Sequence, residues 1–173
     1  SLGLVGSEMC IRDSTASAPP PHSQKEGITM SVLTLDQVRI HAGSSTQQEA
    51  LQEATDILVS VGAVTPAYVD AMRQREETVS TYMGNGLAIP HGTNDTKDAI
   101  LASALSVVRY DGGVDWAGEP ATFVIGIAGR GDEHLEILSQ IAILFSDEDD
   151  VAKLNAAQTP DELYALLLSL IHI

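Results

Sequence analysis

The run "ATFVIGIA" at residues 121–128 constrains the fold more than any other stretch of this sequence. A strand with one face in water alternates apolar and polar residues. This run is apolar on both faces, which is typical of a central strand covered by helices on each side. Residues 31–40, 86–90 and 104–110 are extended or β-rich neighbours for it. Between two of these runs, residues 111–120 ("DGGVDWAGEP") have the composition of a turn.

Two helices are predicted upstream of the central run. Thr46 and Glu49 form the sequence pattern of a capping box, and Gly62 suits the stop of the helix that follows. A second helix is predicted to begin with Thr65 as its N-cap and Pro66 at its first helical position.

Three more helices are predicted downstream. The first carries Leu135, Leu138 and Phe145 on one apolar stripe, and the next two begin at Ser146 and Thr159 as N-caps. Strands and helices therefore alternate along the chain without an internal repeat. The predicted fold class is α/β, a single domain with a small mixed β-sheet flanked by helices on both faces.

The two ends of the chain differ in character from the rest. Residues 1–29 contain a Pro triplet and several Ser residues without periodicity, which predicts a disordered tail. Residues 1–14 and residues 168–173 also resemble translated sequencing adapter, which would make both ends artefactual. On that interpretation the chain starts at Met30, and the domain covers residues 30–167.

Charge and composition exclude several classes of partner. A formal net charge of −15 argues against nucleic acid, whose phosphate backbone is bound by a basic face. The same charge would be repelled by an anionic membrane surface, and no apolar run reaches the roughly 18 residues of a membrane helix. Cys10 is the only cysteine, so an internal disulfide is excluded. With no secretion signal recognised, we expect a cytoplasmic protein without membrane insertion.

His91 is the first candidate for chemistry. It lies in "GNGLAIPHG", where Pro90 restricts the backbone on one side and Gly92 leaves the approach to the ring open on the other. A neutral imidazole is a nucleophile at physiological pH, and the hydroxyl of Thr93 is a nearby hydrogen-bonding group. The alternative is a turn in which an exposed histidine is merely tolerated.

The segment "GRGDEHLEIL" is the second candidate. Arg130 and Gly131 are predicted to form a loop, Asp132 to cap a helix, and His134 to lie in the first turn of that helix. A helix N-terminus offers unpaired N–H groups and the positive end of the dipole, which favours an anion and a neutral imidazole. The alternative is a surface histidine near a helix cap.

Arg75 is the third candidate. Tyr68, Met72 and Arg75 share one side of a predicted helix, so the guanidinium would lie at the margin of the inward face and require an anionic partner. The alternative is a solvated charge run in which Arg75 pairs with Glu76 and Glu77.

A metal-dependent hydrolase is a further hypothesis, with His91, Asp132, Glu133 and His134 as the groups around the ion. The spacing does not support it, because neither H-x-x-x-H nor H-E-x-x-H occurs. We therefore expect no metal at these residues, and no cofactor is predicted. Three other histidines have no role that the sequence supports: His22, His41 and His172.

Taken with these residues, positions 33–167 resemble the enzyme IIA domain of the mannitol/fructose class in the bacterial phosphoenolpyruvate-dependent sugar phosphotransferase system. Three motifs carry the resemblance in the order and spacing of the family: "REETVSTYMGNGLAIPHGT", "VDWAGEPATFVIGIAGRGDEHLEIL" and "TPDELYALL". The combination of "AIPHG" with a downstream "EHL" is specific, although neither piece is specific alone.

The resemblance implies a phosphoryl relay. A small phosphocarrier protein, HPr, would deliver a phosphoryl group to His91, which would pass it to a cysteine of enzyme IIB. The group would end on the sugar that enters through the membrane component IIC. His134 would hydrogen-bond and stabilise the phosphoryl group, and Arg75 would lie near the active site.

The chemistry of the residues agrees with such a relay. Phosphoryl transfer passes through an in-line transition state with charge on three equatorial oxygens, which requires an exposed nucleophile and preplaced donors. His91 is the nucleophile, and His134, Arg75 and Thr93 are the donor candidates. Because residues 30–167 contain no cysteine, the acceptor thiol must lie on another chain.

The motifs "PHGT" and "VIGIAGRGDEHLEIL" look most like the mannitol branch of this family. The alternative is the nitrogen-regulatory branch, in which the same histidine chemistry controls protein partners instead of feeding a transporter. An acidic residue before the second histidine favours transport.

Overall fold

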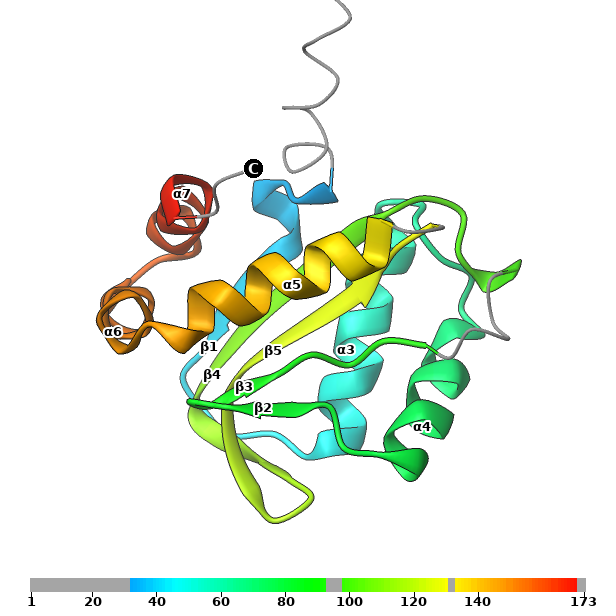
Figure 1. Ribbon diagram of the computed structural model, residues 1–173, viewed down its shortest axis with the longest axis horizontal. Coiled ribbons are helices and arrows are strands. Elements are labelled where there is room, and N and C mark those ends of the chain that lie inside the picture. Colours follow the sequence, from blue (N-terminus) through cyan, green and yellow to red (C-terminus); the bar gives the residue numbers. More distant parts are fainter. Residues whose placement is uncertain (1–31, 93–97, 131–132, 171–173) are drawn as a thin grey trace, which may run out of the picture.

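A five-stranded mixed sheet forms the centre of the protein (Figure 1). The computed structural model describes residues 32–92, 98–130 and 133–170. Within these ranges the strands follow the order β1-β4-β5-β3-β2 across the sheet. Their bounds are Val38–His41 for β1, Tyr82–Gly84 for β2, Leu87–Ala88 for β3, Ala104–Trp116 for β4 and Glu119–Ala128 for β5. Two neighbouring pairs, β1–β4 and β3–β5, are parallel, and the other two are antiparallel. The predicted α/β class with a mixed sheet is confirmed.

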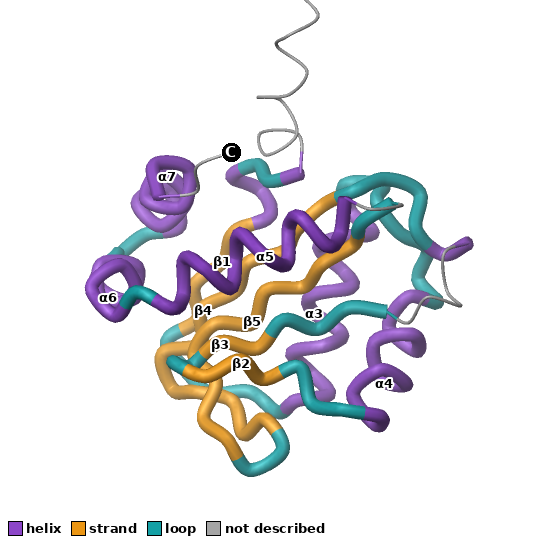
Figure 2. Tube along the Cα trace, viewed as in Figure 1, coloured by secondary structure: helices purple, strands orange, loops and turns teal. Residues whose placement is uncertain are grey.

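Helices cover both faces of the sheet (Figures 1 and 2). One face carries α3 (Gln47–Ser60) and α4 (Tyr68–Thr78), and α5 (Glu133–Ser146) crosses the other face. Two shorter helices, α6 (Glu148–Ala156) and α7 (Pro160–Leu170), pack with α5 in the same hydrophobic cluster. A single 3-10 turn, η1 (Leu35–Gln37), precedes β1.

The central strand β5 shows why both faces are buried. Phe123, Ile125 and Ile127 belong to the cluster with α5, whereas Val124 and Ala128 belong to the cluster with α3 and α4. All five side chains are fully buried. The alternation of strand side chains therefore places apolar residues on both faces, as the continuous apolar run predicts.

Gly126 of β5 lies close to α3 and to the neighbouring strand β4. A Cβ at this position would lie 2.5 Å from Ser106 Oγ and 3.0 Å from the Cβ of Ala54. The Gly126 N–H also donates to Ser106 Oγ at 3.1 Å. A glycine fits here because a side chain would collide with Ser106 of β4 and press against Ala54 of α3.

The predicted start of α3 is confirmed. The Glu49 N–H donates to Thr46 Oγ1 at 3.1 Å, and the Thr46 N–H donates to the Glu49 carboxylate at 3.2 Å, so both halves of the capping box form. The helix ends at Ser60, and Gly62 adopts a φ of +75° in the turn that follows.

The predicted start of the second helix is wrong by two residues. This helix, α4, begins at Tyr68 with Ala67 as its N-cap, and no side chain caps it. Thr65 is held outside the helix because its N–H donates to the Ala99 carbonyl at 2.9 Å and Val64 forms a bridge with Ile100. A long-range pairing thus overrides the local cap signal.

The segment predicted as a turn at residues 111–120 is mostly strand. The strand β4 continues through Trp116, with a register shift between Arg109 and Val114. Only Ala117 and Gly118 form the turn, with φ values of 54° and 93°, as a two-residue hairpin turn requires. Val114 and Trp116 are buried, and this burial keeps the Gly- and Asp-rich segment in the sheet.

The sequence also missed a strand before "GLAIP". The predicted strand is present as β3, but it pairs with β2 in a tight hairpin through Asn85 and Gly86. At the N-terminal end, the segment 31–40 predicted as extended is strand only from Val38 onward.

The apolar stripe of α5 differs from the predicted one. Leu135 is 58% exposed, so its place on the buried stripe is wrong, whereas Leu138 is partly buried and Phe145 is buried as predicted. The other buried positions of α5 are Ile137, Ile141 and Leu144. The first turn of α5 therefore presents an apolar side chain to the surface.

One of the two downstream caps is wrong. Asp147, and not Ser146, caps α6, because its carboxylate accepts hydrogen bonds from the N–H groups of Asp149 and Asp150. Thr159 caps α7 as predicted, through the Glu162 N–H at 3.2 Å. Residues 168–170 continue α7, and Leu170 packs against the core. The predictions for residues 1–29, Met30 and the artefactual end at 168–173 stay predictions, and residues 1–31 and 171–173 lie outside the described ranges.

Candidate functional site

His91 lies at the end of the sheet where two parallel strands finish. It follows β3, forms a parallel bridge with Ile127 of β5, and is preceded by Pro90, whose carbonyl accepts the Ile127 N–H at 3.0 Å. The carboxyl ends of neighbouring parallel strands lie at the same edge of a sheet, which is where α/β proteins commonly bind ligands. The residues after β3 and the residues after β5 therefore lie together at the carboxyl ends of these two strands.

The ring of His91 is oriented by its own backbone. Nδ1 lies 2.8 Å from the carbonyl oxygen of Ile89, and the residue is half-buried. A carbonyl oxygen can only accept a hydrogen bond, so in the neutral ring the proton lies on Nδ1 and the lone pair on Nε2. This contact selects the tautomer in which Nε2 is the nucleophilic atom.

Tyr68 of α4 binds the backbone on both sides of this bridge. Its hydroxyl donates to the Ile127 carbonyl at 2.7 Å and accepts from the Gly92 N–H at 2.9 Å. The side chain is 1% exposed. Burial raises the pKa of Tyr68 to about 12, so the hydroxyl keeps its proton at neutral pH. The sequence placed Tyr68 on an inward stripe but did not connect it to His91.

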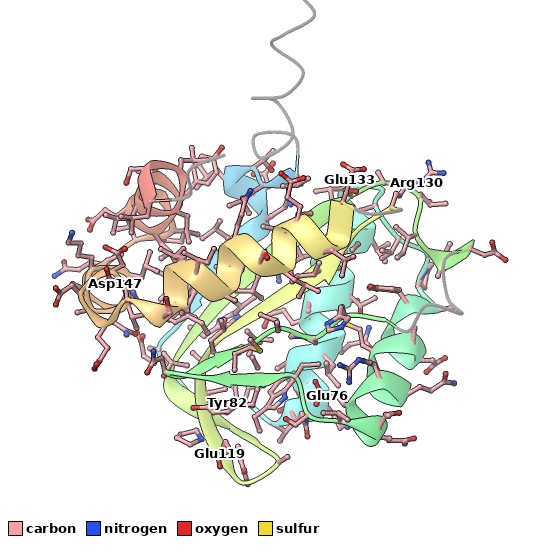
Figure 3. The ribbon with its side chains drawn as sticks, viewed as in Figure 1. Glu76, Tyr82, Glu119, Arg130, Glu133 and Asp147 are labelled. Carbon is pink, nitrogen blue, oxygen red and sulfur yellow. The ribbon has the colours of Figure 1, made fainter. Side chains whose placement is uncertain are left out.

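The N-terminus of α5 lies at the same edge, because α5 follows β5 after a short loop. Ser103 Oγ donates to the Glu133 carboxylate at 3.1 Å and accepts from the Arg130 N–H at 3.0 Å. Figure 3 shows Arg130 and Glu133 together at this end of α5. Ser103 thus ties the loop after β5 to the start of β4.

His134 is the second residue of α5, so its predicted place in the first turn is confirmed for the backbone. Its side chain, together with Gly131, Asp132 and Thr93, lies outside the described part of the structure. The predicted contacts of His134 and Thr93 with a phosphoryl group stay predictions, as do the loop at Gly131 and the helix cap at Asp132.

Arg75 lies in the last turn of α4 and is half-buried. Its guanidinium donates to the Val79 carbonyl at 2.7 Å. Glu76 binds the Thr81 N–H at 3.2 Å and the Thr81 hydroxyl, and the Thr81 carbonyl accepts the Ile89 N–H at 3.1 Å. Arg75 therefore bonds the backbone two residues before Thr81, and the Thr81 carbonyl pairs with Ile89. Its predicted role at the site stays a prediction.

The described residues hold no group of three or more His, Cys, Asp or Glu side chains that could bind a metal. Two of the four residues of the metal-hydrolase hypothesis, Asp132 and His134, have side chains outside the described part, so that hypothesis is not tested here. Across the described ranges, every helix is too short or too polar to cross a membrane.

Comparison with known proteins decides the family. The family model described as "Phosphoenolpyruvate-dependent sugar phosphotransferase system, EIIA 2" matches residues 31–170. The chain belongs to this enzyme IIA family. Its members are phosphotransferases, so the predicted family and enzyme class are confirmed.

Relatives of this enzyme IIA include proteins named for mannitol. It is 44% identical over 140 residues to the mannitol-specific phosphotransferase enzyme IIA component of Halalkalibacterium halodurans, which covers 81% of this chain and 97% of the relative. The component of the same name from Staphylococcus aureus is 46% identical over 128 residues, covering 74% of this chain and 89% of the relative.

A solved structure has the same fold. It is a complex of enzyme IIA mannitol and phosphorylated enzyme IIB mannitol from Escherichia coli. The matched chain has a TM-score of 0.73 at 33% identity, covering 79% of this enzyme IIA and 97% of that chain.

Proposed function

We propose that this enzyme IIA accepts a phosphoryl group on Nε2 of His91 and passes it to a cysteine of enzyme IIB during sugar uptake, with mannitol as the sugar. The observation that carries the proposal is the contact between His91 Nδ1 and the Ile89 carbonyl, which leaves the lone pair on Nε2. The names of the relatives support the choice of mannitol.

The first phosphoryl transfer requires no proton to leave the protein. The Nε2 lone pair attacks phosphorus, the P–N bond of phosphorylated HPr breaks, and the histidine of HPr leaves with the bond's electron pair. The His91 ring then carries the phosphoryl group on Nε2 and keeps the proton on Nδ1. The Ile89 carbonyl, 2.8 Å from Nδ1, stabilises the positive charge on that ring.

The second transfer reverses the roles. A thiolate of enzyme IIB attacks phosphorus, the P–Nε2 bond breaks, and His91 recovers its lone pair as a neutral ring. This chain has no cysteine after Cys10, which is consistent with a thiol on another protein. The structural relative solved with phosphorylated enzyme IIB supports that choice of partner.

Donors for the phosphoryl oxygens come from the edge around His91. His134 in the first turn of α5, Arg75 at the end of α4 and Thr93 after His91 have this role in the proposal. The N–H groups of a helix N-terminus and a guanidinium are both suited to a dianionic group. The reaction then takes place in the cytoplasm, between HPr and the IIB and IIC components of a permease, and needs no cofactor.

The test is transfer from phosphoenolpyruvate through enzyme I and HPr to the full chain, followed by transfer to mannitol enzyme IIB. Acid-labile label on the wild type and none on His91→Ala is the expected result. His41→Ala is the control, because His41 lies in another strand and binds Glu53. Label on His91→Ala would overturn the proposal. Labelled wild type that does not pass the group to IIB would favour the nitrogen-regulatory alternative.

A further inference from the structure

We propose that Tyr68 is a positioning residue for His91. The hydrogen bonds of its hydroxyl fix the backbone conformation around His91, and this conformation determines the orientation of the imidazole. This inference rests on the proposed role of His91 as the phosphoryl acceptor. It concerns a contact between segments far apart in the sequence, since Tyr68 binds Gly92 and Ile127, 24 and 59 residues away.

The three residues Pro90, His91 and Gly92 are held at both ends by one residue of β5. The Ile127 N–H donates to the Pro90 carbonyl at 3.0 Å. A parallel bridge directs the Gly92 N–H toward the Ile127 carbonyl, and the Tyr68 hydroxyl bonds both of these groups. The hydroxyl therefore links the residue after His91 to the bridge partner of His91.

The orientation of the ring depends on this link. The ring bonds the Ile89 carbonyl, two residues back, so a change in the His91 backbone would move Nδ1 away from that oxygen. Loss of the Nδ1 contact would allow the other tautomer, in which Nε2 carries the proton and cannot attack phosphorus. Group transfer is sensitive to displacements of about 1 Å at the reacting atom.

The buried hydroxyl is well suited to this task. Tyr68 is 1% exposed, so water does not replace either hydrogen bond. Its single O–H donates to Ile127, and an oxygen lone pair accepts from Gly92. Removing the oxygen would leave both backbone groups without this partner inside the protein.

Tyr82 provides a matched control within the same chain. Its hydroxyl also donates to a carbonyl, that of Pro120 at 3.1 Å, and also accepts from a glycine N–H, that of Gly86 at 3.2 Å. Figure 3 places Tyr82 close to Glu119, away from Arg130 and Glu133. Removing the Tyr82 hydroxyl breaks the same two kinds of hydrogen bond, but neither of them involves the residues around His91.

The experiment compares Tyr68→Phe and Tyr82→Phe with the wild-type full chain. Single-turnover phosphorylation by phosphorylated HPr is measured as a function of HPr concentration. We expect Tyr68→Phe to lower the limiting rate about tenfold, with half-saturation unchanged, and Tyr82→Phe to stay within about twofold.

Two NMR readouts separate positioning from general stability. In Tyr68→Phe, amide exchange of Gly92 should accelerate about tenfold. The ¹⁵N shifts of His91 should move away from the Nδ1–H tautomer. Leu163→Ala, a destabilising change at a buried position of α7 in the hydrophobic cluster that does not contain Tyr68, should leave both readouts unchanged.

A wild-type limiting rate in folded Tyr68→Phe, with unchanged tautomer shifts, would overturn the inference. If Tyr68→Phe does not fold, the wild type decides: a slowly exchanging Tyr68 hydroxyl proton with a contact to the Gly92 amide is expected, and its absence overturns the inference. If the wild type accepts no phosphoryl group, the proposed function fails, while the exchange and tautomer readouts still test the positioning.

Discussion

Two histidines at strand ends, His91 and His41, show how the hydrogen-bond partner decides what an imidazole can do. His91 Nδ1 faces a backbone carbonyl at 2.8 Å, and the ring is half-buried. His41 Nε2 faces the Glu53 carboxylate at 2.7 Å, and its side chain is 45% exposed. The carbonyl contact leaves Nε2 as the unprotonated nitrogen of neutral His91, whereas Nε2 of His41 is the nitrogen that bonds Glu53, together with Arg39 and Tyr110.

Glu53 is the centre of the hydrogen-bonded group that contains His41. It also accepts from Arg39 at 3.0 Å and from the Tyr110 hydroxyl at 2.6 Å. Burial raises the pKa of the Glu53 carboxyl, but hydrogen bonds from Tyr110, His41 and Arg39 outweigh burial and lower the pKa below its ordinary value. This cluster ties β1 and β4 to α3, so its role is structural.

The largest effect should separate the two histidines directly. His91→Ala should lower phosphoryl acceptance by at least about 10³-fold, because the nucleophile is removed. His41→Ala should stay within about twofold. The initial rate of acid-labile labelling measures phosphoryl acceptance in both variants. An equal loss of rate in His91→Ala and His41→Ala would show that the two histidines do not differ in function.

His134→Ala should have the next largest effect. Removing one donor to a charged transition state commonly costs about 10²-fold, so slower onward transfer to enzyme IIB is expected while His91 is still labelled. Ser139→Ala, an exposed change in the same helix, is the control. The rate of label transfer to IIB is measured, and an unchanged rate in His134→Ala would rule out its role as a donor.

Arg75→Gln should lower the transfer rate about tenfold, since a single charge-assisted hydrogen bond is lost. Arg73→Gln changes the same residue type in the same helix, where it binds Asp70 and Gln48, and should stay within about twofold. Rapid-quench measurement of His91 labelling compares them. Equal labelling rates in the two variants would show that Arg75 only stabilises the end of α4 and takes no part in phosphoryl transfer.

Glu53→Gln should leave the transfer rate unchanged and lower the free energy of unfolding by roughly 1–2 kcal/mol at pH 7. Because the folded pKa of Glu53 is lowered, its stabilisation is present above the unfolded pKa of about 4.3. It is lost as the pH falls through the folded pKa. Thermal unfolding from pH 7 to pH 3 should show the wild type and the variant converging on the acid side.

Features that depend on neighbouring residues were predicted well. The capping box of Thr46 and Glu49 and the cap at Thr159 form as expected, because each joins groups three residues apart. The strand before Pro90 and the burial of β5 on both faces follow from local steric and apolar patterns. His91 itself was found by its place between Pro90 and Gly92.

Features that depend on pairing between distant segments were missed. Thr65 has a good cap sequence, but its N–H bonds Ala99, so α4 starts later. The Gly- and Asp-rich residues 111–120 became strand because Val114 and Trp116 are buried against the helices. In both cases the tertiary contact outweighed a local preference.

The sequence by itself determined the α/β class, the double-sided burial of the central strand and the identity of the candidate nucleophile. The three-dimensional structure showed which nitrogen of His91 faces the Ile89 carbonyl two residues back. Only tertiary contacts decided which residue binds the backbone around His91. The physical reason is range. Helix caps and apolar periodicity act over a few residues, whereas the Tyr68 hydroxyl meets Ile127 and Gly92 only after α4, β3 and β5 have packed together.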